Sequence, residues 1–202
     1  MSIKALIWDL EGVLLITSDD TIEQALARRL NVPVEAIGKI FHGEFNDRVD
    51  IGEFTQHDFW LHALDILGMP HSRLPDLEAF FNEDFFIDQD MVERVRQYHR
   101  RFKTALLSNY SDVLRPMLES RWKMDGAFDE IIISWEVKII KPDPAIFDLA
   151  LERLAVTKEE AVLIDDRIVN IRGADSYGLH TVYFQNKQQG LHDLDKIIAR
   201  YE

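Results

Sequence analysis

Two pairs of acidic residues stand directly after apolar runs of the sequence, where side chains could act together on one ligand. Asp9 and Glu11 follow the first run, and residues two apart in an extended segment point to the same side. Asp165 and Asp166 follow a later run, and adjacent carboxylates at a buried strand end repel each other unless a cation lies nearby. A hard divalent cation with oxygen ligands would supply that charge. Each acid taken alone also fits a helix cap or a solvated turn.

Three further residues could bind an anion. Ser108 and Asn109 offer a hydroxyl and an amide after another apolar run, although such residues also serve turns and caps. Lys141 precedes Pro142-Asp143-Pro144, whose prolines fix the backbone and whose Asp143 is suited to cap the next helix. A lysine held on a rigid turn can meet a phosphate as a point charge, whereas the ordinary alternative is a surface lysine.

Strands must position these residues, and the apolar pattern predicts five of them. From residue 91 onward, short apolar runs alternate with helix-period stretches, which is typical of β-α-β units and a parallel sheet. We therefore predict an α/β fold with a doubly wound, Rossmann-like parallel sheet. Ligands bind such sheets at the carboxyl ends of the strands, where the polar residues cluster. The predicted strands are 3–10, 104–107, 131–133, 161–164 and 181–184, and the predicted helices are 91–102, 113–122, 144–154, 168–177 and 191–201.

The segment after the first strand breaks this rhythm. Between residues 15 and 89 the apolar residues recur at helical spacing, over 21–30, 34–41, 55–67 and 77–85. We interpret it as an all-helical insertion. The predicted domains are an α/β core of residues 1–15 and 90–202 and an inserted helical domain of residues 16–89.

Composition limits the partners of the chain. The 202 residues, 47% of them hydrophobic, are enough to bury a core, and no apolar window is long enough to span a membrane. A formal net charge of −13 argues against nucleic acid as a partner. The absence of cysteine excludes disulfides and thiolate sites, and together with an N-terminus unlike a signal peptide it favours a cytoplasmic protein. We expect a monomer or a homodimer, and an anionic substrate would need a local positive centre.

In this order the motifs resemble those of the haloacid dehalogenase superfamily, over the whole chain. The position of the helical insertion is similar to that of the capped branch of this family. The resemblance implies a phosphatase that uses Mg²⁺ and an aspartyl-phosphate intermediate to hydrolyse a small phosphorylated metabolite. The corresponding segments are Asp9-Leu10-Glu11-Gly12-Val13, Leu107-Ser108-Asn109, Lys141-Pro142, and Ile164-Asp165-Asp166 with Asn170.

The resemblance also implies a role for each residue. Asp9 would be the nucleophile, Ser108 or Asn109 would bond the phosphoryl oxygens, and Lys141 would neutralise charge between them. The magnesium ligands would be the Asp9 carboxylate, the main-chain carbonyl of Glu11, and Asp166, with Asp165 close by or in the outer shell. Glu11 departs from the pattern, because phosphatases of this family usually have Asp there as the general acid. The extra methylene of Glu moves the carboxyl group by more than about one ångström, so Glu11 would be a working acid in a re-spaced pocket, a slow acid or a residue with another role.

Two other functions stay open. A hydrolytic haloacid dehalogenase would use the same nucleophile without a metal, although such enzymes generally have an aromatic residue in place of Glu11 and lack the pair of acids at 165 and 166. A non-catalytic relative would bind a phosphorylated ligand. The cap would select the leaving group, and the turn before a predicted cap helix marks four candidate substrate residues: Arg48, Glu53, Phe54 and His57.

Overall fold

The computed structural model describes residues 2–17, 21–83, 85–124 and 126–202. Its centre is a parallel sheet with the strand order β5-β4-β1-β6-β7. The chain runs from β1 outward to β5, then crosses back to β6 on the other side of β1, so the order reverses around β1. This confirms the predicted doubly wound α/β fold. The strands are β1 (Ala5–Trp8), β4 (Lys103–Ser108), β5 (Glu130–Ile133), β6 (Ala161–Asp165) and β7 (His180–Tyr183).

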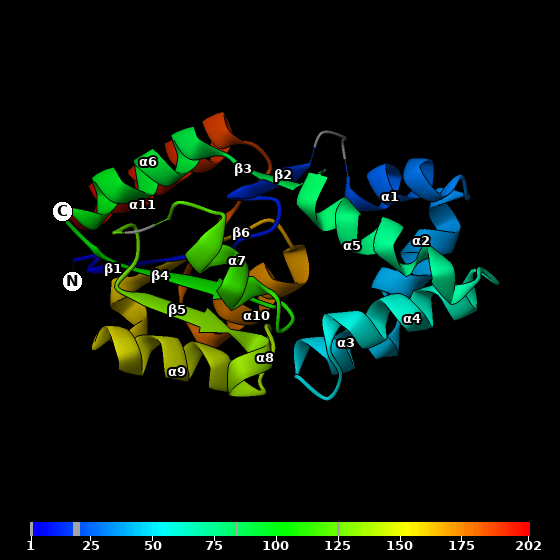
Figure 1. Ribbon diagram of the computed structural model, residues 1–202. Coiled ribbons are helices and arrows are strands. Elements are labelled where there is room, and N and C mark those ends of the chain that lie inside the picture. The colour runs from blue at the N-terminus through cyan, green and yellow to red at the C-terminus, as the bar shows by residue number, and fades with distance from the viewer. Residues whose placement is uncertain (1, 18–20, 84, 125) are drawn as a thin grey trace.

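Helices cover both faces of the sheet (Figure 1). Side chains alternate along β1, so Leu6 and Trp8 pack with α6 (Gln89–His99) and α11 (Lys187–Tyr201). On the other face, Ala5 and Ile7 belong to a second apolar cluster with α9 (Pro144–Leu154) and α10 (Ile168–Tyr177). Both faces being buried explains why the first strand is an unbroken apolar run. The remaining core helices are α7 (Leu114–Ser120), α8 (Ser134–Val137) and η2 (Lys158–Glu160).

The helices of the insertion lie together beyond the carboxyl ends of the strands, while both chain termini lie at the opposite end of the core (Figure 1). Thr21 and Thr55 begin two of these helices with reciprocal capping boxes. Phe59, Trp60 and Phe80 are buried and belong to the larger apolar cluster, which continues from the core into the cap. The cap helices are α1 (Ile22–Leu30), α2 (Val34–Phe41), α3 (Glu44–Asp50), α4 (Gln56–Ile66), η1 (His71–Arg73) and α5 (Leu74–Glu83).

Two short antiparallel strands join cap and core, and the sequence pattern did not predict them. β2 (Leu15–Thr17) pairs with β3 (Phe85–Ile87). The helix predicted to reach residue 85 therefore ends at Glu83. Phe85 is buried and Phe86 is 48% exposed, which is the two-residue alternation of a strand. A three-residue strand forms because a partner far along the chain supplies its hydrogen bonds, and local periodicity carries no such signal. The division into residues 16–89 and the rest stays a prediction.

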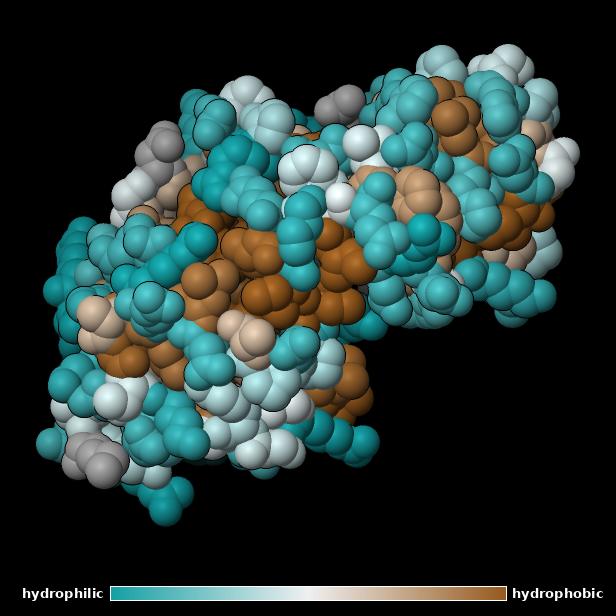
Figure 2. All heavy atoms as spheres, turned by 90° about the horizontal axis from the view of Figure 1, so that it is seen from below, coloured by the Kyte–Doolittle hydropathy of each residue, from teal (hydrophilic) through white to brown (hydrophobic). Residues whose placement is uncertain are grey.

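The cap docks on the core through specific polar contacts. Gln56 at the start of α4 donates its backbone N–H to Asp112 Oδ1 at 2.8 Å, and its side-chain oxygen accepts from Ser111 Oγ at 2.6 Å. The indole N–H of Trp135 donates to the Phe54 carbonyl at 3.1 Å. Seen from below, the two lobes meet side by side, with apolar side chains gathered over the core (Figure 2). Among the described residues, no helix has the length and apolar character needed to cross a membrane.

Candidate active site

Asp9 follows β1 at the centre of the sheet and is 5% exposed. Its backbone N–H donates to the Ile164 carbonyl of β6 at 2.9 Å, which extends the strand pairing by one residue. Its Oδ1 accepts from the Leu10 N–H and from Lys141 Nζ, both at 2.7 Å. The sheet therefore fixes the carboxylate, and Oδ2 is the oxygen left for a ligand.

Lys141 is 3% exposed and lies between two carboxylates. Its Nζ is 2.7 Å from Asp9 Oδ1 and 2.7 Å from Asp165 Oδ2. Burial would lower the pKa of Lys141, but the charges of Asp165 and Asp9 outweigh it and raise the pKa above its ordinary value. Lys141 is thus a permanent cation at the carboxyl ends of β1 and β6.

Asn109 holds the turn that carries this lysine. Its Oδ1 accepts from the Lys141 backbone N–H at 2.8 Å, and its Nδ2 donates to the Lys141 carbonyl at 3.0 Å. Ser108, by contrast, is 1% exposed, and its Oγ has no hydrogen-bond partner in the described part of the chain. A buried hydroxyl without a partner is costly unless a ligand satisfies it. Ser108 and Asn109 were predicted as alternative hydrogen-bond partners of a phosphoryl oxygen. In the structure, the Asn109 amide bonds the backbone of Lys141, whereas the Ser108 hydroxyl is available to a ligand.

Asp165 is the fully buried last residue of β6, and protein groups saturate its carboxylate. Besides Lys141, it accepts from the Arg167 N–H at 2.8 Å and from Asn170 Nδ2 at 3.1 and 3.0 Å. This network holds the start of α10 against the strand end. Asp165 therefore organises the site, which leaves Asp166 freer to meet a ligand.

The carboxylates of Asp9, Asp165 and Asp166 offer ligand oxygens that lie within 4.8 Å of one another. Burial, followed by the charge of Asp165, raises the pKa of Asp9 well above its ordinary value. The same causes raise the pKa of Asp166 to about 6. Three carboxylates share one lysine, so the cluster carries an excess of negative charge. This set of oxygen donors fits Mg²⁺, because a hard divalent cation removes that excess.

Gly12 makes the turn that closes the site beside Asp166. Its φ is +70°, and its N–H donates to the Leu15 carbonyl at 3.0 Å. A Cβ at this position would lie 2.1 Å from Asp166 Oδ2 and 2.5 Å from Asp166 Cγ. Only glycine lets the backbone come this close to the carboxylate.

We expect Gly12→Ala to displace Asp166 and to abolish the thermal stabilisation of the protein by Mg²⁺. Differential scanning fluorimetry with and without Mg²⁺ measures that stabilisation. The matched control is Gly68→Ala, since Gly68 also has a positive φ, of +63°, but a Cβ there would meet no atom within 4 Å. The control should lose about 1–2 kcal/mol from the left-handed backbone alone and should keep its response to Mg²⁺. An unchanged response in Gly12→Ala would contradict the packing of Gly12 on Asp166.

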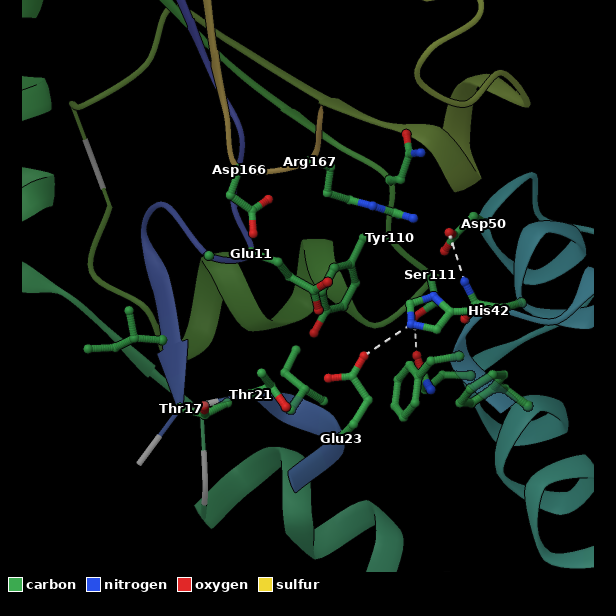
Figure 3. Close-up of a pocket in the computed structure, with 18 residues that line it drawn as sticks. Glu11, Thr17, Thr21, Glu23, His42, Asp50, Tyr110, Ser111, Asp166 and Arg167 are labelled. Atoms are coloured by element: carbon green, nitrogen blue, oxygen red, sulfur yellow. Dashed lines mark hydrogen bonds and ion pairs between the residues drawn. The ribbon is translucent and has the colours of Figure 1, made fainter. Parts of the chain in front are cut away.

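A cavity of about 660 Å³ lies above these residues, between core and cap. Glu11, Asp166 and Arg167 enter it from the core, and Glu23, His42 and Asp50 enter it from the cap (Figure 3). Asp9, Ser108 and Lys141 do not line it but lie buried next to lining residues. The other lining residues are Gly12, Ile16, Thr17, Thr21, Ile22, Phe41, Asn46, Gln56, Phe59, Asn109, Tyr110 and Ser111.

Glu11 lines this cavity as a half-buried side chain. Burial, with the negative charges of Asp50 and Asp166, raises its pKa to about 8. A carboxyl group with this pKa holds its proton at neutral pH, as a general acid must. The structure thus gives the longer side chain at this position an environment suited to proton donation.

The four cap residues predicted to contact a substrate are not among the residues that line this cavity, and their role stays a prediction. Arg48 Nε bonds Glu53 Oε2 at 2.7 Å, and the Arg48 guanidinium stacks over Phe54 at 4.6 Å. His57 Nδ1 lies 3.4 Å from Glu78 Oε1 of α5. Asn46 and Asp50 line the cavity instead; residues four apart share a helix face, and Arg48, two residues from each, lies off that face.

Sequence reasoning did not identify Glu23, His42, Asp50 or Arg167. Arg167 carried a signal, because it directly follows the acid pair at the end of a predicted strand. The three cap residues carried none. They come from α1, the end of α2 and the end of α3, and only the packing of these helices brings them to one wall.

The acids of the cavity give the metal-free protein a defined pH dependence. Burial is the main cause that raises the pKa of Glu11, Asp50 and Asp166, to about 8, 7 and 6. A carboxyl group whose pKa is higher in the folded chain than in the unfolded chain stabilises the fold at low pH and loses that contribution as pH rises through the folded pKa. We therefore expect the melting temperature in chelator to fall from about pH 6 to pH 8.

Thermal melts across this pH range, with chelator and with Mg²⁺, test this expectation. Mg²⁺ should reduce the fall, because the ion binds the ionised carboxylates. Glu11→Gln should flatten the upper part of the curve, where the Glu11 carboxyl titrates. A melting temperature that rises with pH in chelator would contradict the burial of these acids.

Fold and site together define a hydrolase of a known class. Residues 3–178 match the family model of haloacid dehalogenase-like hydrolases, and the chain belongs to this family. The match covers the central strands, the inserted cap and every residue of the candidate site.

Individual relatives include proteins of different chemistry. The chain is 35% identical to mouse acyl-CoA dehydrogenase family member 10 over 98% of its own length, but it spans only 19% of that protein. It is 26% identical to glyceraldehyde 3-phosphate phosphatase of Pyrococcus furiosus, covering 96% of the chain and 85% of that enzyme. It is also 37% identical to (S)-2-haloacid dehalogenase 1 of a Pseudomonas strain. That match covers 40% of this chain and 36% of the dehalogenase.

Solved structures share the fold. An enzyme of the same family from Bacteroides thetaiotaomicron, crystallised with magnesium and inorganic phosphate, superposes with a TM-score of 0.70. The identity is 23%, and the match covers 89% of this chain and 93% of the other. At this identity the likeness supports the fold of core and cap.

Proposed function

We propose that the protein hydrolyses small phosphate monoesters with Mg²⁺, through an aspartyl-phosphate on Asp9. The observation that carries this proposal is the buried arrangement in which Lys141 bridges Asp9 and Asp165 at 2.7 Å, beside Asp166. A lone carboxylate in this position would be protonated and unreactive. The Lys141 ammonium, together with a divalent cation bound by the neighbouring carboxylates, would keep Asp9 ionised as a nucleophile.

The Asp9 and Asp166 carboxylates and the main-chain carbonyl of Glu11 would hold Mg²⁺, with Asp165 as an outer neighbour. Mg²⁺ would supply positive charge to the phosphoryl oxygens, which is the main requirement of phosphoryl transfer. The ammonium group of Lys141 adds a second positive charge, and the free hydroxyl of Ser108 donates a hydrogen bond to a phosphoryl oxygen.

In the first step, Asp9 Oδ2 attacks phosphorus and the bond from phosphorus to the alcohol oxygen breaks. Glu11 donates its proton to that oxygen, so the alcohol leaves as a neutral molecule and Glu11 becomes a carboxylate. In the second step, Glu11 takes a proton from water as the water attacks phosphorus. The bond between phosphorus and Asp9 Oδ2 breaks, inorganic phosphate leaves, and Asp9 returns as a carboxylate and Glu11 as a protonated acid.

Turnover of a chromogenic aryl phosphate, with Mg²⁺ and with chelator, tests this function. We expect release of phosphate that needs Mg²⁺ and returns when Mg²⁺ is added back. Turnover that continues in the presence of chelator would contradict the proposed requirement for Mg²⁺. Stabilisation by Mg²⁺ and phosphate without turnover would favour the non-catalytic alternative.

A haloacid dehalogenase remains the second candidate, since one relative has that activity and would use the same Asp nucleophile. Halide release from a 2-haloacid, unaffected by chelator, would support it. The crowding of Asp166 beside Asp9 favours the phosphatase, because a reaction without metal gains nothing from a third carboxylate. The cytoplasmic location and the monomeric or homodimeric state stay predictions.

A further inference from the structure

The cap wall of the cavity carries two carboxylates. Glu23 Oε1 lies 3.4 Å from His42 Nε2. Asp50 Oδ2 accepts from Asn46 Nδ2 at 3.3 Å, and within the described ranges no cation lies within ion-pair distance of Asp50. The proposed reaction uses neither side chain. Both face the space that the leaving group of a substrate would fill (Figure 3).

Positive charge in this space is scarce. Arg167 is the only Lys or Arg among the described lining residues, whereas Glu11, Glu23, Asp50 and Asp166 line the same cavity. On the cap side of the cavity, Glu23 and Asp50 face Arg167 and the His42 imidazole. A substrate with a second anionic group would meet repulsion at the cap wall. A cationic group would be attracted.

Aromatic residues line the cavity from both sides. Phe41 and Phe59 line it from the cap, where their ring centroids are 5.4 Å apart, and Tyr110 lines it from the core. The face of an aromatic ring attracts an ammonium group, and more strongly where water is excluded. Carboxylates beside aromatic rings form a surface suited to an organic cation.

We propose that the leaving group carries a protonated amine, so that the substrates are phosphate monoesters of amino alcohols or amino sugars. This inference rests on the proposed phosphatase function. Asp50 and Glu23 bind the ammonium group while the phosphoryl group sits over Asp9. The cap thus selects by charge, in addition to closing the site.

Three esters with two-carbon leaving groups provide the test: 2-aminoethyl phosphate, ethyl phosphate and carboxymethyl phosphate. We expect kcat/KM to fall in this order, by about tenfold at each step, since each step changes one charge near the cap carboxylates. High salt should narrow the differences. If ethyl phosphate and 2-aminoethyl phosphate are hydrolysed with equal kcat/KM, the proposal is wrong, while the phosphatase function stands.

Asp50→Asn separates the role of the cap wall from that of the amine itself. It should reduce the ratio of kcat/KM between 2-aminoethyl and ethyl phosphate by about fivefold or more. Glu44→Gln is the matched control, because Glu44 lies on the same helix, is exposed and does not line the cavity. An equal ratio in wild type and Asp50→Asn would overturn the assignment. If no ester, including the chromogenic aryl phosphate, is hydrolysed, both proposals fall together.

Discussion

Asp9→Asn should reduce the turnover of a phosphate monoester by about 10⁴-fold or more, because the amide oxygen cannot form the acyl-phosphate. The fold should remain. Asn presents the same oxygen to the Leu10 N–H and to Lys141 Nζ, which now bond Asp9 Oδ1 at 2.7 Å. Burial and the charge of Asp165 raise the pKa of Asp9, so an ionised carboxylate is unfavourable at this position. The neutral Asn should therefore leave the melting temperature of the metal-free protein unchanged or higher.

Initial rates and thermal melts on the same preparations measure both effects. Mass spectrometry of the acid-quenched enzyme should also detect one added phosphoryl group in the wild type and none in the variant. Asp143→Asn is the control substitution, because Asp143 is exposed, caps α9, and keeps that capping ability as Asn. Retention of wild-type turnover in Asp9→Asn would overturn the assigned nucleophile.

Lys141→Met should have the second large effect, on both stability and rate. The substitution leaves the buried carboxylates of Asp9 and Asp165 without their cationic partner, whose ammonium group lies 2.7 Å from each of them. Removing one partner of a buried ion pair typically costs about 3–5 kcal/mol of folding free energy. The rate should fall by about 10²–10³-fold, as when one group that stabilises the transition state is lost.

Chemical denaturation of the metal-free variants measures the loss of folding free energy. The loss should shrink as pH falls, because the pKa of Asp9 rises further without Lys141 and the carboxyl group takes up a proton. Adding Asp165→Asn to Lys141→Met should restore part of the stability but none of the activity. Lys196→Met is the surface control, since its ammonium group lies 3.2 Å from Asp193 at the solvent-exposed surface, where an ion pair adds little to stability. A Lys141→Met protein as stable as the wild type would contradict the buried bridge.

Local sequence predicted the five strands of the core sheet and its longer helices, but not the short α8 and η2. The unbroken apolar run at β1 and the alternation of short runs with helical stretches predicted a parallel sheet covered on both faces, as observed. Helices α9 and α10 were predicted at their observed bounds. These features follow from burial and backbone propensity, which act over a few residues.

The assignment of Asp9, Ser108, Lys141 and the 165–166 acid pair to one site also came from sequence. Their order at strand ends was enough, because a doubly wound sheet brings the carboxyl ends of its central strands together. The structure distinguished their tasks: Asp165 is saturated by Lys141 and Asn170, while Ser108 keeps a free hydroxyl. Such differences depend on hydrogen-bond partners from other segments.

Sequence alone thus determined the sheet, and it predicted the inserted cap and the set of residues at the strand ends. Tertiary structure alone decided which cap residues line the cavity: Asp50, Glu23 and His42 do so, and the predicted Arg48 and His57 are not among the lining residues. The rotation of each cap helix depends on how its apolar face packs against the others, and a rotation of half a turn exchanges cavity and solvent faces. Tertiary structure also set the surroundings of Glu11, since the residues that raise its pKa come from α3 and from the end of β6.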